Sequence, residues 1–111
     1  MSPHDELAYG ATEYVLAAPS SMYIAYTPHL IGDMGLKNMS SGKYDFKWID
    51  GLSGKTIEQL GVIVGSGNRA WSKPVGFGNE VAVYIEKSHL NDRKKMMRNI
   101  KSLKIQGIIL L

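Results

Sequence analysis

The sequence predicts an all-β fold, an antiparallel β-sandwich of about seven to eight strands, and three observations support this prediction. Residues 43–50 alternate, so we expect Tyr44, Phe46 and Trp48 on one face of a strand, with Asp45 and Lys47 on the opposite, solvated face. Strand-like segments recur about every ten to fifteen residues, with turn residues between them. The 12 glycines and 6 tyrosines suit a turn-rich β fold better than a helical one.

The composition is that of one globular domain. The chain has 111 residues, with 44% hydrophobic and 21% charged residues, which is enough to bury a working core. It contains no cysteine, which excludes disulfides and thiol chemistry. Cysteine content therefore gives no information about the cellular compartment. Residues 1–6 are polar and unlike a signal peptide, and no segment approaches the roughly 18 apolar residues of a membrane span. We therefore expect no membrane partner.

The net charge of +3 is unevenly distributed. Residues 88–111 carry six Lys or Arg and one acidic residue, whereas residues 1–87 carry seven Lys or Arg and nine acidic residues. A mildly acidic body argues against a nucleic-acid-binding surface. We divide the chain into a β-sandwich of residues 1–87 and a basic tail of residues 88–111.

Residues 1–87, called the body here, are predicted to form short strands separated by turns. Strands are expected, in order, at residues 7–9, 12–18, 22–27, 43–50, 60–64 and 80–87, the second and third of them forming a hairpin. In the last strand, Val81, Val83 and Ile85 are expected to face the core. Residues 28–42 and 65–79 are rich in glycine and are expected to be irregular, although Leu36 and Met39 should reach the core.

The tail has a different pattern. Asn91 can cap a helix over the basic residues that follow it, and residues 105–111 are apolar enough for a short strand. An exposed apolar end would be a patch prone to association. We therefore expect it to be buried, either on this chain or in a homodimer formed through the tail.

Four segments of the body, taken together and in order, resemble a known family. They are Glu-Tyr-Val-Leu-Ala-Ala-Pro (13–19), Tyr-Ile-Ala-Tyr (23–26), Gly-Lys-Tyr through Trp-Ile-Asp to Ser-Gly-Lys (42–55), and Lys-Pro (73–74) before Val-Ala-Val-Tyr-Ile (81–85). The pattern is similar to the C-terminal domain, named for collagen binding, that follows apiosidase-like (β/α)-barrel glycoside hydrolases. The resemblance spans residues 5–87. It departs from the family where Gly51 and Lys73 replace prolines and where the closing strand lacks a tryptophan.

The resemblance implies a β-sandwich and a non-catalytic accessory role. Such a domain would either pack against a catalytic (β/α)-barrel domain or bind glycan or collagen. Proteins of the parent family are expected to be secreted, hence extracellular or periplasmic. The sequence of this chain does not indicate a localisation of its own. Two alternatives stay open: a free-standing carbohydrate-binding module and, with less support, a small independent enzyme.

Two glycine motifs imitate nucleotide sites without the required context. Gly65 to Ala70 matches a dinucleotide-binding spacing, but that site needs a helix to open at the glycines, and Pro74 and further glycines follow. Ser53 to Thr56 matches the end of a phosphate-binding loop, but Ile49 stands where that loop needs glycine. We therefore assign no cofactor.

Neither a metal site nor a catalytic site is assigned. The three histidines are scattered, whereas zinc needs three or four clustered ligands. The carboxylates lack a recognisable catalytic context, although a glycosidase pair drawn from distant strands stays open.

The candidate ligand-binding residues are Trp71, Arg69 and Lys73. They lie close together in a glycine-rich segment, and an exposed tryptophan with cationic neighbours suits a sugar ring or a protein partner. The alternative is that the Trp71 ring folds over one end of the sandwich. Trp48, by contrast, is expected in the core because it alternates with two other aromatic residues.

Overall fold

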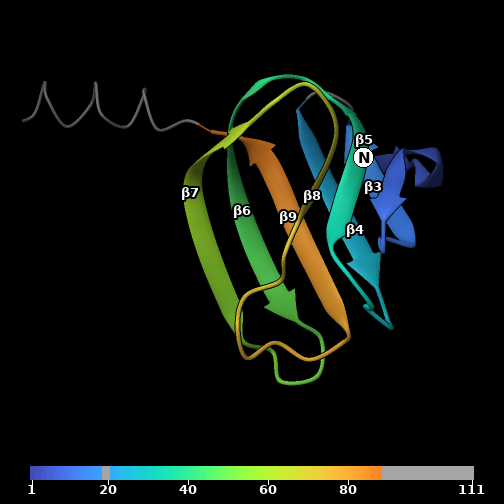
Figure 1. The fold of residues 1–111 in the computed structure, drawn as a ribbon, viewed down its shortest axis with the longest axis vertical. Coiled ribbons are helices and arrows are strands. Elements are labelled where there is room, and N and C mark those ends of the chain that lie inside the picture. Colours follow the sequence, from blue (N-terminus) through green and yellow to red (C-terminus); the bar gives the residue numbers. More distant parts are fainter. Residues whose placement is uncertain (19–20, 89–111) are drawn as a thin grey trace, which may run out of the picture.

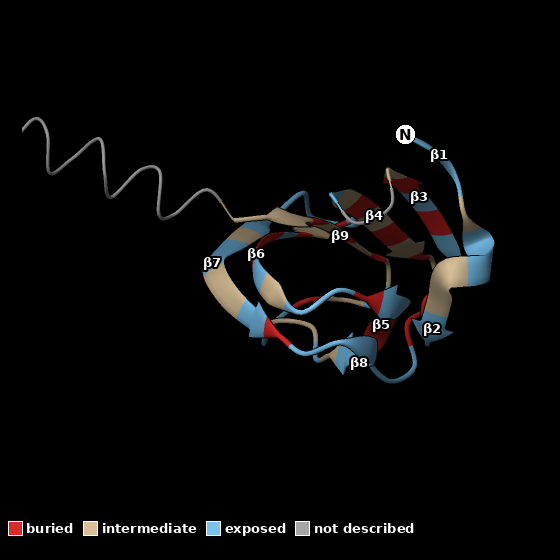
Figure 2. Ribbon diagram, turned by 90° about the horizontal axis from the view of Figure 1, so that it is seen from above, coloured by how far each residue is buried: buried red, intermediate tan, exposed pale blue. Residues whose placement is uncertain are grey.

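The computed structural model describes residues 1–18 and 21–88, and these residues form two antiparallel β-sheets (Figure 1). Seen from above, the sheets face each other, and the buried residues line the space between them (Figure 2). The predicted all-β sandwich is confirmed. No helix in the described part of the chain is long and apolar enough to cross a membrane.

The large sheet has six strands, and all of its neighbouring strands are antiparallel. In spatial order they are β1 (Ser2–Pro3), β3 (Tyr14–Ala18), β4 (Met22–Thr27), β9 (Val81–Lys87), β6 (Gly42–Asp50) and β7 (Thr56–Val64). The expected hairpin is confirmed by the pairing of β3 with β4 from Tyr14–Tyr26 to Ala18–Met22. Part of its turn, residues 19–20, lies outside the described residues.

The small sheet has three strands, in the order β2 (Ala8–Gly10), β5 (Met34–Met39) and β8 (Gly67–Trp71). The expectation that residues 28–42 and 65–79 are irregular was therefore wrong for β5 and β8. Glycines in both segments obscured them, yet their pairing with each other satisfies backbone groups along the side that they share. With these strands and β1, the described residues hold nine strands rather than seven or eight. As expected, Leu36 and Met39 reach the core, with exposed fractions of 0% and 2%.

The aromatic strand β6 lies at the centre of the core, as predicted. Tyr44, Phe46 and Trp48 are almost fully buried, with exposed fractions of 0–1%. Their polar atoms are still satisfied, because the Tyr44 hydroxyl donates to the Ser40 carbonyl (2.8 Å) and the Trp48 indole N–H donates to Gln59 Oε1 (3.0 Å). The predicted inward face of β9, formed by Val81, Val83 and Ile85, packs beside these rings with no exposed surface.

Asp45 corrects the prediction that the second face of β6 is fully solvated. Its side chain is buried, with 8% exposure, where β7 bulges between Gln59 and Val62. The bulge turns a backbone N–H toward Asp45: Gly61, at φ 65°, donates to Asp45 Oδ1 at 2.9 Å. The carboxylate therefore stabilises an irregularity that an alternation pattern cannot reveal.

The turn after β6 is organised by Asp50, which is also buried (5% exposed). Its two carboxylate oxygens accept the backbone N–H groups of Leu52 (3.0 Å) and Gly78 (3.2 Å), and these bonds hold its pKa below the ordinary value. Asp50 thus ties the turn after β6 to the segment before β9.

At the N-terminus, a short 3-10 helix, η1 (Asp5–Leu7), precedes β2. The strand expected at residues 7–9 therefore begins one residue later. The expected helix and strand of the basic tail fall on residues 89–111, which lie outside the described part of the chain.

Candidate functional site

The structure gives each of the three predicted ligand-binding residues a contact within the chain. Trp71 is half-buried in β8 and meets Phe46 edge to face, with ring centroids 4.9 Å apart. The ring therefore packs against the buried core cluster.

The side chains of Arg69 and Lys73 each donate hydrogen bonds to nearby loop residues. The Arg69 guanidinium donates to the carbonyls of Gly65 and Ser66 at 2.9–3.2 Å. The Lys73 ammonium donates to the Gly78 carbonyl (2.8 Å) and to Asn79 Oδ1 (3.2 Å). Ligand binding by Trp71, Arg69 and Lys73 stays a prediction, and these contacts are ones that a ligand would have to share or displace.

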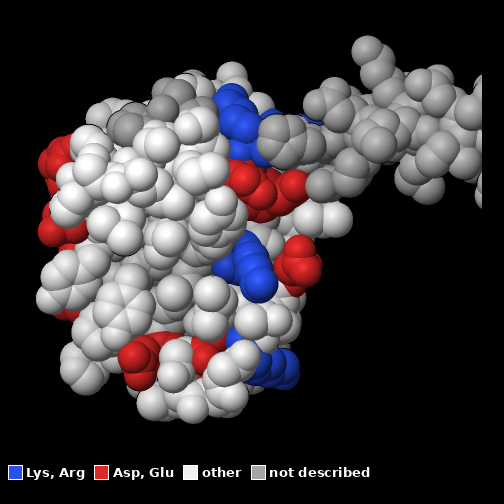
Figure 3. All heavy atoms as spheres, turned by 180° about the vertical axis from the view of Figure 1, so that it is seen from behind, with Lys and Arg blue, Asp and Glu red and all other residues white. Residues whose placement is uncertain are grey.

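A different surface of the molecule carries the exposed ring of Tyr14 beside that of Tyr26. On the hairpin β3–β4, the side chains that face away from the core form a shallow hollow of about 420 Å³. Its lining residues are Pro3, Asp5, Tyr14, Val15, Leu16, Ile24 and Tyr26. Figure 3 shows this face from behind, with an uncharged area over β3 and β4 and charges of both signs toward β6 and β7.

Two tyrosine rings lie next to each other in the lining of this hollow. Tyr14 and Tyr26 are directly paired across the hairpin and lie nearly parallel, with centroids 6.1 Å apart and planes 26° apart. Tyr14 is 53% exposed and Leu16 is 44% exposed, whereas the inward-facing Tyr23 and Ala25 are buried. The hairpin therefore places large apolar side chains on both of its faces.

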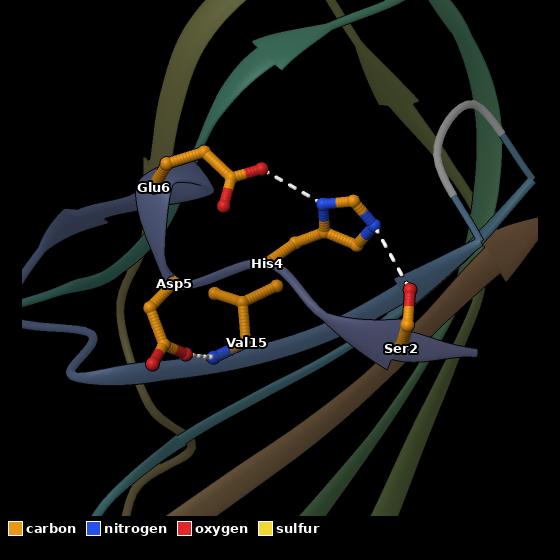
Figure 4. A network of polar contacts seen from close by, with 5 residues as sticks. All are labelled: Ser2, His4, Asp5, Glu6 and Val15. Carbon is orange, nitrogen blue, oxygen red and sulfur yellow. Dashed lines mark hydrogen bonds and ion pairs between the residues drawn. The ribbon is translucent and has the colours of Figure 1, made fainter.

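The N-terminal segment builds one wall of the hollow, and Figure 4 shows how it is attached. The His4 N–H donates to the Val15 carbonyl (2.7 Å), and the Val15 N–H donates to Asp5 Oδ1 (2.9 Å). These two bonds fix Pro3 and Asp5 beside β3. The His4 imidazole also donates from Nδ1 to Glu6 Oε2 (2.7 Å), which lowers the pKa of Glu6, and its Nε2 lies 3.2 Å from Ser2 Oγ.

Carboxylates lie at the other rim. The Tyr26 hydroxyl donates to Glu80 Oε2 at 2.9 Å, and this bond raises the pKa of Tyr26. The Glu13 carboxylate accepts a bond from the buried Thr27 hydroxyl at 3.2 Å. The hollow is thus an apolar surface with an acidic border, a pattern typical of a docking surface.

A second, smaller depression lies on the charged half of the same sheet. It has a volume of about 170 Å³ and is lined by Asp45, Phe46, Lys47, Glu58, Leu60, Tyr84 and Glu86. Burial, followed by the nearby Glu86 charge, raises the pKa of Tyr84. Among the described residues, no three His, Cys, Asp or Glu side chains gather in a way that could hold a metal ion.

The sequence pattern contained a signal for the hollow. Tyr14 and Leu16 share one face of their strand, as do Met22, Ile24 and Tyr26, and the structure places these two faces side by side on the outside. Both faces of the second strand are apolar in the sequence, so alternation by itself could not show which one would remain exposed.

Comparisons with protein-family models, with curated proteins and with solved structures returned no match for this chain. The fold defines an all-β sandwich, and the outer face of β3 and β4 carries an apolar hollow.

Proposed function

We propose that this sandwich is a non-catalytic accessory domain of a glycoside-hydrolase-like protein, and that it packs against a catalytic (β/α)-barrel domain. The family resemblance suggests the role, and the all-β fold agrees with it. The observation that carries the proposal is the largely apolar hollow on β3 and β4.

The composition of the hollow favours a protein partner. Exposed tyrosine side chains are common anchors at the centre of protein interfaces, with polar groups at the rim. Tyr14 supplies such an anchor, Leu16 adds apolar area beside it, and Glu80 lies at the rim through its bond to Tyr26. A sugar site needs several converging polar groups as well as a ring, and the floor of this hollow is apolar.

A second candidate function is glycan or collagen binding at the same rings. The nearly parallel Tyr14 and Tyr26 rings support it, since aromatic faces bind the apolar faces of sugars and of extended proline-rich chains. In that case the tyrosines would carry the affinity, and Leu16 would contribute less.

The docking proposal is tested with the neighbouring coding sequence and the protein that it encodes. We expect a (β/α)-barrel domain to be encoded beside this chain, and we expect the two to bind in calorimetry when they are mixed. Leu16→Lys should weaken binding by about tenfold or more, because it places a charge in a desolvated contact. Leu52→Lys is the matched control, since Leu52 is 75% exposed in the turn after β6.

Three outcomes separate the candidates. The absence of a barrel domain, or equal binding by the Leu16→Lys variant, contradicts docking through the hollow. Binding to a glycan array or to a triple-helical collagen peptide that Tyr14→Ala abolishes would favour the second candidate. Turnover of an aryl-glycoside panel that is lost on mutating one carboxylate would overturn the non-catalytic role.

A further inference from the structure

Among the described residues, strand β7 forms an open edge of the large sheet. It lies at one end of the strand order and pairs only with β6, and no hydrogen bond joins its outer side to another described residue. The opposite edge is β1, which has two residues and contains Pro3, whereas β7 has nine residues. Among the edges of the two sheets described here, β7 is therefore the longest.

The pairing of β6 shows which groups of β7 point outward. On the β9 side of β6, the Lys43 carbonyl accepts a hydrogen bond from the Ser88 backbone N–H. On the β7 side, the Asp50 backbone N–H donates to the Lys55 carbonyl. Backbone N–H and C=O groups point to alternate sides along a strand. Those of even-numbered residues in β6 therefore point toward β7, and those of odd-numbered residues point toward β9. Glu58 and Ile63 pair with the odd-numbered Lys47 and Lys43, so their N–H and C=O groups point away from the sheet.

The devices that usually protect an edge are sparse on β7. Native edge strands are commonly blocked by proline, by lysine or by short length. Residues 56–64 contain no proline and no lysine, and Glu58 is their single charged residue. Leu60 and Ile63 are large hydrophobic side chains that are 54% and 80% exposed. A β-bulge is also a protective device, and β7 has one at Leu60–Gly61, with regular pairing to β6 on either side of it.

We propose that β7 pairs with β7 of a second copy of this chain, antiparallel and about a twofold axis, so that the two large sheets become continuous. In this register Glu58 of one copy lies opposite Ile63 of the other. Both residues point their backbone groups outward, and both pair with odd-numbered residues of β6, which places their side chains on the same face. The twofold axis passes through the bulge. The residues before the bulge in one copy therefore pair with the residues after the bulge in the other copy.

Self-complementarity selects this partner and this register. Pairing Glu58 with Glu58 would set like charges opposite each other, which is destabilising. Pairing Ile63 with Ile63 would use only the last residues of β7 before its end at Val64. The proposed register avoids both problems, and it leaves the outer face of β3 and β4 free for the docking function proposed above.

Light scattering on the full chain gives the first test. We expect a dimer, and we expect Ile63→Glu to raise its dissociation constant by about tenfold or more, because the introduced carboxylate faces Glu58 of the second copy. Within one chain the same carboxylate lies beside Lys43, so the fold should be kept. Ile31→Glu is the matched control, because Ile31 is 88% exposed and lies outside β7. A chain that is monomeric at every concentration, or a variant that dimerises like the wild type, overturns the proposal.

Cross-linking tests the register, and the chain offers a clean background because it contains no cysteine. A mixture of the Glu58→Cys and Ile63→Cys variants should form a disulfide-linked heterodimer under mild oxidation. Opposed residues of a hydrogen-bonded pair lie about 5.5 Å apart, within disulfide reach. Two copies of position 58 would be separated by about 16 Å along the strands. A link that forms as readily in either variant alone contradicts this register.

Discussion

Truncation of Trp48 is the perturbation whose effect follows most directly from the structure. The indole has no exposed surface, contacts Phe46 with ring centroids 6.3 Å apart, and donates to Gln59. We expect Trp48→Ala to lower the free energy of unfolding by about 3–5 kcal/mol, the range for large aromatic truncations in a core. A typical domain has about 5–15 kcal/mol of stability in total, so this variant should be close to unfolding.

Two further variants divide this cost into its parts. Trp48→Phe keeps most of the ring volume and should cost about 1–2 kcal/mol, since it removes part of the buried surface and leaves a smaller cavity. The lost hydrogen bond should add little, because Gln59 is exposed and water can replace the donor. Ile31→Ala is the control for an exposed apolar residue and should change stability by less than about 0.5 kcal/mol.

The assay is urea denaturation followed by far-ultraviolet circular dichroism, which does not depend on the tryptophan that is removed. Fluorescence of a Trp71→Phe variant adds an independent readout, because the remaining Trp48 should emit in the blue and resist quenching by iodide. A cost below about 1 kcal/mol for Trp48→Ala, or a red and easily quenched emission, would refute the central place of this residue in the core.

Two other predictions concern single positions. Gly35→Ala should cost about 2 kcal/mol or more in thermal unfolding, because its Cβ would lie 2.7 Å from the Arg69 carbonyl oxygen and 2.9 Å from the Tyr9 ring; Gly78→Ala, which meets neighbours at 3.4 Å or beyond, should cost much less. The lowered pKa of Asp50 means that its carboxylate stabilises the fold above the ordinary value of 3.8, and that this contribution is lost as pH falls through the folded pKa. Asp50→Asn should therefore be less stable at pH 7 and should lose less stability on acidification, as followed by thermal melts across pH; an unchanged acid dependence would contradict this role.

The sequence by itself determined the all-β class, the hairpin and the two strands that build the core. Alternation at Tyr44, Phe46 and Trp48 and at the valines of β9 was sufficient, because a period of two has a direct structural meaning when one face is clearly apolar. The sequence also singled out Trp71, and it left open whether the ring lay on a surface or over the core.

The tertiary structure decided what local patterns do not contain. Strands β5 and β8 exist because they pair with each other across a long sequence separation, which glycine-rich segments do not announce. Asp45 is buried because β7 bulges opposite it. The exposed face of β4 is the one with Tyr26, because the small sheet covers the other face, and a hairpin that is apolar on both sides cannot specify that choice locally.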